Sequence, residues 1–78
     1  MRKIEKADKL KLRRDGGEYF GNKTYFSYDM YTHEEDVIKL KEIIEKYGYE
    51  IEEQSMNPSL EDWEVITNVP YSELWDNN

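Results

Sequence analysis

Residues 24–48 read TYFSYDMYTHEEDVIKLKEIIEKYG, and they decide the fold because an alternating aromatic segment runs directly into an amphipathic one. Phe26, Tyr28 and Met30 fall on one side of an extended chain, and aromatic residues at period two are typical of a half-buried strand. From residue 33 the apolar residues recur at helical spacing and form one stripe along a helix, Val37, Leu40, Ile43, Ile44 and Tyr47. The pattern predicts a strand over residues 24–31 and a helix that ends before residue 48.

The ends of this helix carry their own signals. Thr32 is followed three residues later by Glu35, which predicts a capping box in which each side chain bonds a backbone N–H of the first turn. Gly48 lies where a residue with left-handed backbone would end the helix.

The composition indicates one small folded domain that comprises residues 1–78. Hydrophobic and charged residues each make up 37% of the chain, and the seven Tyr, two Trp and two Phe favour folding over disorder. A core of this size supports about 3–5 kcal/mol of stability. The absence of cysteine excludes disulfides and zinc–thiolate sites, and we expect no cofactor and no metal.

The charge is unevenly distributed along the chain. Residues 1–14 hold seven basic and two acidic residues, whereas residues 15–78 hold four basic and sixteen acidic ones, and the net charge is −7. The sequence predicts a basic head over residues 1–8, either frayed or a short helix, on a strongly acidic body.

The rest of the chain reads as short strands separated by turns. We predict strands over residues 9–13, from 18 to 20, over 49–53 and over 60–67, a turn at 15–17, a turn or bulge at 21–22, a loop at 54–59 and a helical turn at 71–75. The order predicts an α+β fold, an antiparallel sheet of about four to five strands with one amphipathic helix packed across a face. The predicted core is Leu10, Leu12, Phe20, Phe26, Tyr28, Met30, Val37, Leu40, Ile44, Tyr47, Ile51, Trp63 and Val65.

No catalytic motif is present in the sequence. His33 is the only histidine and we expect it to be solvated; no serine or threonine has a base beside it in any motif, and no glycine-rich phosphate loop occurs. The chain is therefore predicted not to be an enzyme. It also lacks an apolar run of membrane-spanning length and a signal peptide, which predicts a cytoplasmic protein that contacts no membrane.

Two acidic surfaces are candidate partner-binding sites. If strands 49–53 and 62–66 pair, four carboxylates share the outer face and roughly imitate the spacing of a phosphate backbone, Glu50, Glu52, Asp62 and Glu64. On the helix, Ile38 lies about 160° from the centre of the apolar stripe, and Glu34, Glu42 and Glu45 surround it. An exposed apolar residue ringed by acids is typical of an interface anchor. The competing interpretation of both surfaces is an ordinary solvated exterior.

The composition is similar to that of short, cysteine-free, acidic and aromatic-rich proteins, many of them encoded by phages and plasmids, that bind and block a host protein. We therefore predict a small acidic, non-enzymatic binding protein. It would be a phage- or plasmid-type inhibitor, in the host cytoplasm if phage-encoded, that docks on a basic, nucleic-acid-handling host protein and does not itself bind duplex DNA.

Three alternatives stay open. A second copy of the chain could replace the partner in a homodimer. The chain could instead bind nucleic acid directly, with the basic N-terminal segment on phosphates and Tyr19, Phe20, Tyr25 and Tyr31 stacking on bases. It could also be a structural or assembly component.

Overall fold

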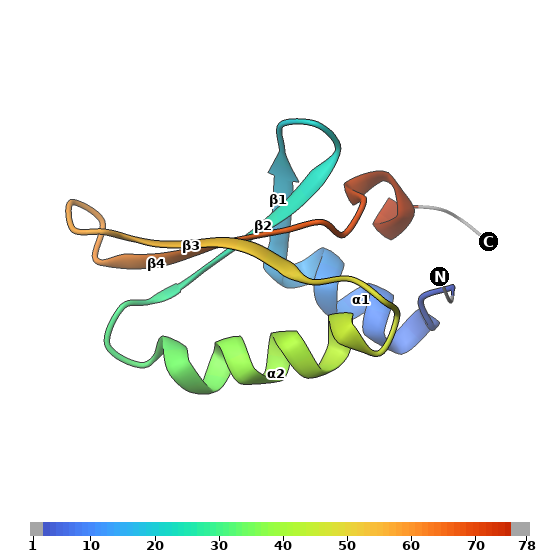
Figure 1. Cartoon of the computed structure of the whole chain (residues 1–78), viewed down its shortest axis with the longest axis horizontal. Helices are drawn as coiled ribbons and strands as arrows, with labels where there is room; N and C mark the ends of the chain where they lie inside the picture. The colour runs from blue at the N-terminus through green and yellow to red at the C-terminus, as the bar shows by residue number, and fades with distance from the viewer. Residues whose placement is uncertain (1–2, 76–78) are drawn as a thin grey trace.

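The structure, a computed structural model, describes residues 3–75 and contains one four-stranded antiparallel sheet with two helices (Figure 1). The strands lie in the order β1-β2-β4-β3. This confirms the predicted α+β class and antiparallel sheet, with a second helix that the sequence analysis did not predict. In chain order the elements are α1 (Lys6–Asp15), β1 (Gly16–Tyr19), β2 (Lys23–Asp29), α2 (His33–Glu45), β3 (Ile51–Asn57), β4 (Asp62–Thr67) and the 3-10 helix η1 (Tyr71–Trp75).

The decisive stretch folds as predicted, as β2 followed by α2. Val37, Leu40, Ile44 and Tyr47 of the helical stripe are buried in the core. Gly48 has a φ of 86° in the turn that follows α2, which is the left-handed conformation predicted for it.

The predicted capping box was wrong, because Thr32 makes no side-chain hydrogen bond at the start of α2. Asp29 fixes the turn instead: its carboxylate accepts the backbone N–H of Tyr31 (2.8 Å), and its carbonyl accepts that of Thr32 (3.2 Å).

The strand predicted over residues 9–13 was wrong, because this segment lies within α1. Lys9 and Leu12 are buried three positions apart, which is a helical spacing, whereas Leu10 is 47% exposed. Ile4 is buried as well, so the basic head is docked rather than frayed over residues 3–8; residues 1–2 lie outside the described part of the chain.

Gly16 is required at the junction of α1 and β1, where the sequence analysis expected a turn. A Cβ atom on Gly16 would lie 2.7 Å from Cγ2 of Thr24 and 2.9 Å from the carbonyl oxygen of Leu12. Only glycine lets the end of α1 lie this close to β2.

Glu18 and Tyr19 lie in β1 as predicted, but this strand begins at Gly16, within the predicted turn, and ends before Phe20. The turn predicted at 21–22 is confirmed, since Gly21 and Asn22 form the hairpin turn with positive φ values of 75° and 58°. The predicted loop at residues 54–59 was wrong for its first four residues, which extend β3 to Asn57.

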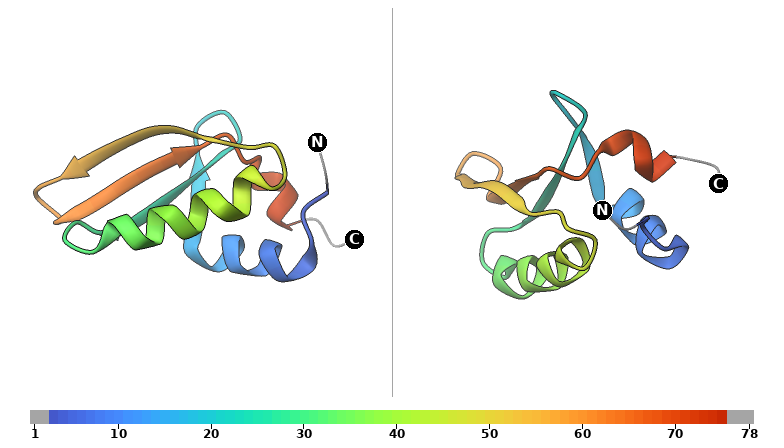
Figure 2. Two further views of the ribbon diagram at one scale, coloured as in Figure 1. Left: turned by 60° about the horizontal axis from the view of Figure 1, so that its bottom comes forward. Right: turned by 45° about the vertical axis from the view of Figure 1, so that its right-hand side comes forward.

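The core lies between the sheet and the two helices (Figure 2). Of the predicted members, Leu10 and Phe20 are exposed and Met30 is only partly buried, because Phe20 occupies the β1–β2 turn and Met30 follows the end of β2. Tyr28, Ile51 and Trp63 are partly buried against the core, while Ile4, Tyr49, Val69 and Leu74 join it without having been predicted.

Polar contacts hold α1 against the rest of the domain. The Tyr47 hydroxyl donates to the Asp8 carboxylate, and Lys46 Nζ lies 2.8 Å from the same group. At the other end of α1, Arg13 Nε donates to the carbonyl oxygen of Leu74 (2.6 Å), and its guanidinium lies 4.6 Å from the ring centroid of Trp75. No helix within residues 3–75 is long and apolar enough to cross a membrane.

Candidate protein-binding surface

One face of the sheet carries neither helix. Figure 2 (left) shows α1 and α2 in front of the sheet on the same side, and this leaves the opposite side, here called the open face, uncovered by helices. Because side chains alternate along a strand, the register assigns the open face. Tyr25 pairs with Ile66, and Ile66 pairs with Glu53, so these three side chains form one row across β2, β4 and β3 on the open face.

Three aromatic residues of the β1–β2 hairpin form a cluster on and beside this face, Tyr19, Phe20 and Tyr25 (the aromatic cluster). The ring of Tyr19 meets those of Phe20 and Tyr25 edge-on, with centroid distances of 5.4 and 6.3 Å. Phe20 is 86% exposed, so most of its ring contacts solvent. An exposed phenylalanine next to two partly exposed tyrosines is the composition of a protein-interface hot spot.

The turn that carries Phe20 is held from the C-terminal side. The Asn22 carbonyl accepts the backbone N–H of Tyr71 (3.3 Å), and its side chain bonds both the N–H and the hydroxyl of Ser72 (3.0 and 3.1 Å). The hairpin tip is thus tied to η1, which lowers the entropy lost when Phe20 is fixed in a complex.

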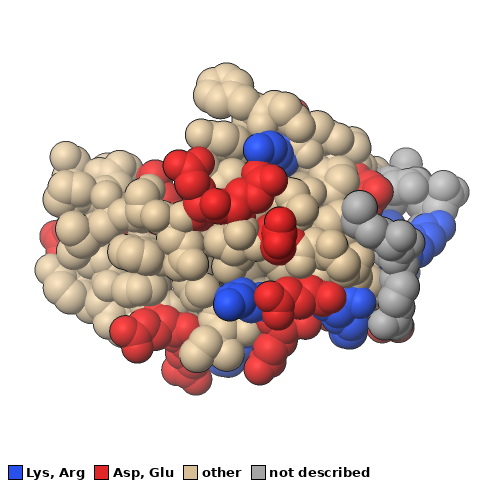
Figure 3. Space-filling view, viewed as in Figure 1, with Lys and Arg blue, Asp and Glu red and all other residues tan. Residues whose placement is uncertain are grey.

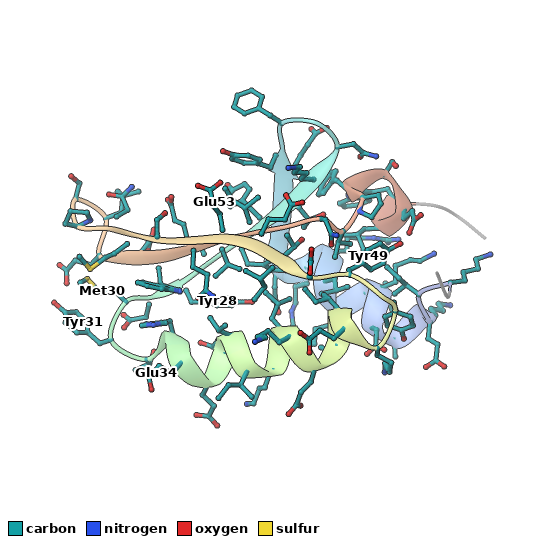
Figure 4. All side chains as sticks on the ribbon, viewed as in Figure 1. Tyr28, Met30, Tyr31, Glu34, Tyr49 and Glu53 are labelled. Atoms are coloured by element: carbon teal, nitrogen blue, oxygen red, sulfur yellow. The ribbon has the colours of Figure 1, made fainter. Side chains whose placement is uncertain are left out.

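Carboxylates lie next to the aromatic cluster. Glu53 is in the same cross-strand row as Tyr25, and Figure 4 shows it on the side of β3 opposite to α2. Lys23 Nζ lies 2.6 Å from Glu52, and this ion pair raises the pKa of Lys23. Glu64 is diagonal to Tyr25, since it pairs with Ser27. In the space-filling view, acidic side chains gather over the middle of β3 with a basic one beside them (Figure 3).

The predicted ladder of carboxylates does not form. Glu50 precedes β3, and β3 extends beyond the predicted strand to Asn57, so that Ser55 lies opposite Glu64 and Asn57 opposite Asp62. A bulge interrupts the register between Ile51 and Glu53. Glu52 and Glu64 remain on the open face, but at different places along the strands. The like-charged pair that does form is Asp29 with Asp62, directly opposite one another on β2 and β4, an arrangement that lowers stability.

The second predicted surface lies on the other side of the domain. Ile38 is 57% exposed on the side of α2 turned away from the sheet, as predicted. Glu34, Glu42 and Glu45 are also exposed. A single rigid partner cannot contact this surface and the open face together, because the core lies between them.

The single histidine of the chain packs against an aromatic ring. His33 is stacked on Trp63, with ring centroids 4.2 Å apart, and its Nδ1 lies 2.8 Å from the carbonyl oxygen of Met30; the expectation that it is solvated was therefore wrong. Within residues 3–75 no group of three or more His, Asp or Glu side chains is placed to hold a metal ion.

Hydrogen bonds and burial account for the perturbed pKa values of Asp8, Tyr49 and Tyr28. Hydrogen bonds from Lys46 and Tyr47 lower the pKa of Asp8. Burial, assisted by a 2.8 Å hydrogen bond from its hydroxyl to Glu73, raises the pKa of Tyr49 to about 12. Burial also raises the pKa of Tyr28, which Figure 4 shows between the sheet and α2.

No protein-family model matches the chain, and searches of curated proteins and of solved structures found no match either.

The sequence analysis named some residues of the open face and missed others. Glu52, Asp62 and Glu64 were predicted as contacts, whereas Glu53 and Ile66 were not. Tyr19 and Tyr25 were named only in the nucleic-acid alternative, as side chains that would stack on bases. Phe20 was assigned to the core, although its position directly before Gly21-Asn22, a turn signal, was the indication that it occupies a hairpin tip.

Proposed function

We propose that this chain is a small, non-enzymatic binding protein whose open face docks on a basic surface of a partner protein. The observation that carries the proposal is the aromatic cluster, in which Phe20 is 86% exposed and Tyr25 shares a cross-strand row with Glu53. Aromatic side chains at the centre of an interface supply most of the binding energy.

The charge determines the kind of partner. The chain has a net charge of −7, and on the open face Lys23 is already paired with Glu52. Such a surface attracts basic partners and repels acidic ones, with the largest effect on association rate.

A partner that handles nucleic acid fits this chemistry. The surface on which such a protein binds phosphates is basic, so an acidic protein seated on it competes with the nucleic acid. The proposed consequence of binding is inhibition, as in the phage- and plasmid-type proteins of similar composition.

Direct nucleic-acid binding finds less support in the geometry. Part of the basic N-terminal segment is engaged in the fold: Lys9 is buried, Arg13 bonds Leu74 and Arg14 lies 3.0 Å from Asp15. Of the aromatic residues that would stack on bases, Tyr25 lies in one row with Glu53 and diagonal to Glu64, and these carboxylates repel phosphates. We expect no measurable binding of duplex DNA at physiological salt.

The test is affinity capture with the full chain and matched variants. The immobilised chain should retain a basic protein, and DNA should compete for that protein. The double variant Phe20→Ser, Tyr25→Thr should bind the isolated partner at least tenfold more weakly, whereas Ile38→Asp should bind it normally; circular dichroism verifies that each variant is folded.

Two results would change the proposed interface or the proposed function. If Ile38→Asp abolishes binding while the double variant does not, the interface is the outer side of α2. If the chain alone binds duplex DNA at micromolar concentration and physiological salt, the direct nucleic-acid function replaces the one proposed.

A further inference from the structure

The two edges of the sheet differ in length and in their neighbours. β1 has four residues, and η1 packs beside it and bonds the turn that follows it. β3 has seven residues and pairs with β4 on one side. No described residue forms a hydrogen bond to the outer main-chain edge of β3 between Glu52 and Met56.

Natural sheets usually protect a long edge with lysine, proline or a bulge in the strand. β3 reads Ile-Glu-Glu-Gln-Ser-Met-Asn and contains neither lysine nor proline. Its bulge lies at the start, between Ile51 and Glu53, so the edge is regular from Glu53 to Asn57. Along this stretch every second residue therefore points its N–H and C=O groups away from β4 in extended geometry, and no described residue bonds them.

The two sides of this edge have different chemistry. Glu53 and Ser55 point to the open face, because they pair with Ile66 and Glu64. Gln54 and Met56 point to the helix side; Met56 is 49% exposed, and the Gln54 side chain accepts the indole N–H of Trp63 at 2.9 Å. In a strand added here, side chains on the open face would lie beside the carboxylate of Glu53. Those on the helix side would lie beside the apolar thioether of Met56.

We propose that the β3 edge takes an extended segment of the partner as a fifth strand, with basic residues beside Glu53 and apolar residues beside Met56. This rests on the proposed function, because it assumes that the partner is basic. Main-chain hydrogen bonds fix such a strand, and the alternating side chains select its sequence. Opposite charges across neighbouring strands stabilise the pairing.

A second copy of this chain is the less favoured occupant. Two copies would bring together two bodies that each carry a net charge of −7, and the same Glu52 and Glu53 would approach one another from both edges. A basic strand meets no such repulsion.

The test uses the peptide acetyl-Lys-Val-Lys-Val-Lys-Val-Lys-amide as the probe and isotope-labelled full chain as the target. Binding is followed by NMR shifts and by hydrogen exchange of the backbone amides. We expect exchange at one or more of the amides from Glu53 to Met56 to slow at least tenfold in the complex. The same peptide with its internal amides N-methylated keeps the charges, loses the donors, and should bind at least tenfold more weakly.

A charge-reversal pair supplies the control on the protein side. Glu53→Lys should weaken binding of the unmodified peptide at least fivefold. Glu45→Lys changes the net charge by the same amount on α2, away from the sheet, and should alter binding less than twofold at physiological salt.

The outcomes separate the two proposals. If the peptide changes the NMR shifts of Tyr19, Phe20 and Tyr25 but the β3 amides stay unprotected, strand addition is refuted. The proposed function of the open face is not affected by that result. Absence of peptide binding at millimolar concentration refutes strand addition alone, since capture of the partner tests the function independently. Protection of β3 in the chain without peptide, together with dimers in sedimentation, assigns the edge to a second copy and overturns the inference.

Discussion

Replacing Tyr47 with phenylalanine tests how α1 is held on the domain. The ring of Tyr47 is buried in the core, and its hydroxyl donates to the Asp8 carboxylate of α1 and accepts the backbone N–H of Glu5 at 3.3 Å. Phenylalanine keeps the ring and removes the hydroxyl, so the change isolates these polar contacts.

The expected loss of unfolding free energy follows from the charge and exposure of the acceptor, the Asp8 carboxylate. A hydrogen bond to a charged group contributes about 1.5–3 kcal/mol. The Asp8 side chain is 20% exposed and keeps Lys46 at 2.8 Å, so we expect the lower end, about 1.5 kcal/mol. This is a third to a half of the roughly 3–5 kcal/mol available to a domain of this size, and it corresponds to a fall in Tm of about 6–12 °C.

Urea unfolding followed by circular dichroism measures the loss as a shift in midpoint at constant slope. Tyr31→Phe is the matched control, because Tyr31 is largely exposed. Asp8→Asn completes a double-mutant cycle and should show coupling of about 1 kcal/mol.

The pH dependence has a definite sign. Lys46 and Tyr47 lower the pKa of Asp8, so its contribution is present above the ordinary aspartate pKa and is lost as pH falls through the lowered value. The difference between the native chain and Tyr47→Phe should therefore shrink on acidification. Equal midpoints for Tyr47→Phe and Tyr31→Phe, or additive losses in the cycle, would refute this account of α1.

Four further predictions concern the core, the surface and the alkaline limit. Leu40→Ala removes a buried residue of α2 and should cost about 2–5 kcal/mol in urea unfolding; a midpoint that barely moves contradicts the assigned stripe. Gly16→Ala forces a Cβ against Thr24 and the carbonyl of Leu12 and should cost about 1–3 kcal/mol, whereas an unchanged midpoint would show that the junction relaxes freely. Ile38→Asp should change the unfolding free energy by less than about 0.5 kcal/mol, and a collapse of stability would place Ile38 in the core. Because the pKa of Tyr49 is raised to about 12, its contribution is complete below the ordinary tyrosine pKa of about 10 and is lost as pH rises toward 12. Stability measured from pH 9 to 12 should thus fall less steeply in Tyr49→Phe than in the native chain.

The centre of the fold was predictable because its signals are long and agree with one another. Five apolar residues at helical spacing, four of them in α2 and Tyr47 just after its end, follow an alternating strand, and packing the helix on the sheet buries both apolar sides. The α1 segment offered only Leu10 and Leu12 as an alternating pair, which is too short a pattern to distinguish strand from helix. This helix is stabilised by contacts with residues far away in sequence, above all the hydrogen bond between Tyr47 and Asp8. The local sequence pattern does not reveal such contacts.

The candidate surface was less predictable than the core for two reasons. Alternation divides strand residues into two sets, but it does not say which set the helices leave uncovered. β3 then continues to Asn57, through residues predicted as a loop, which moves its pairing along β4, so the predicted ladder of four carboxylates became separate acidic sites. Identifying Phe20 as exposed needed only the correct hairpin turn at Gly21-Asn22.

The pairing of β2 with β4 sets the time at which the open face can exist during synthesis. Thr24 and Thr67 face one another across these central strands, and the Thr67 hydroxyl donates to the carbonyl oxygen of Thr24 at 2.9 Å across a sequence separation of 43 residues. Such a pairing waits for closure of a long loop, whereas the β3–β4 hairpin is local. Tyr25 and Ile66 therefore become neighbours only after residue 66 has left the ribosome. In the proposed complex, binding to the open face would begin only when β4 has entered the sheet.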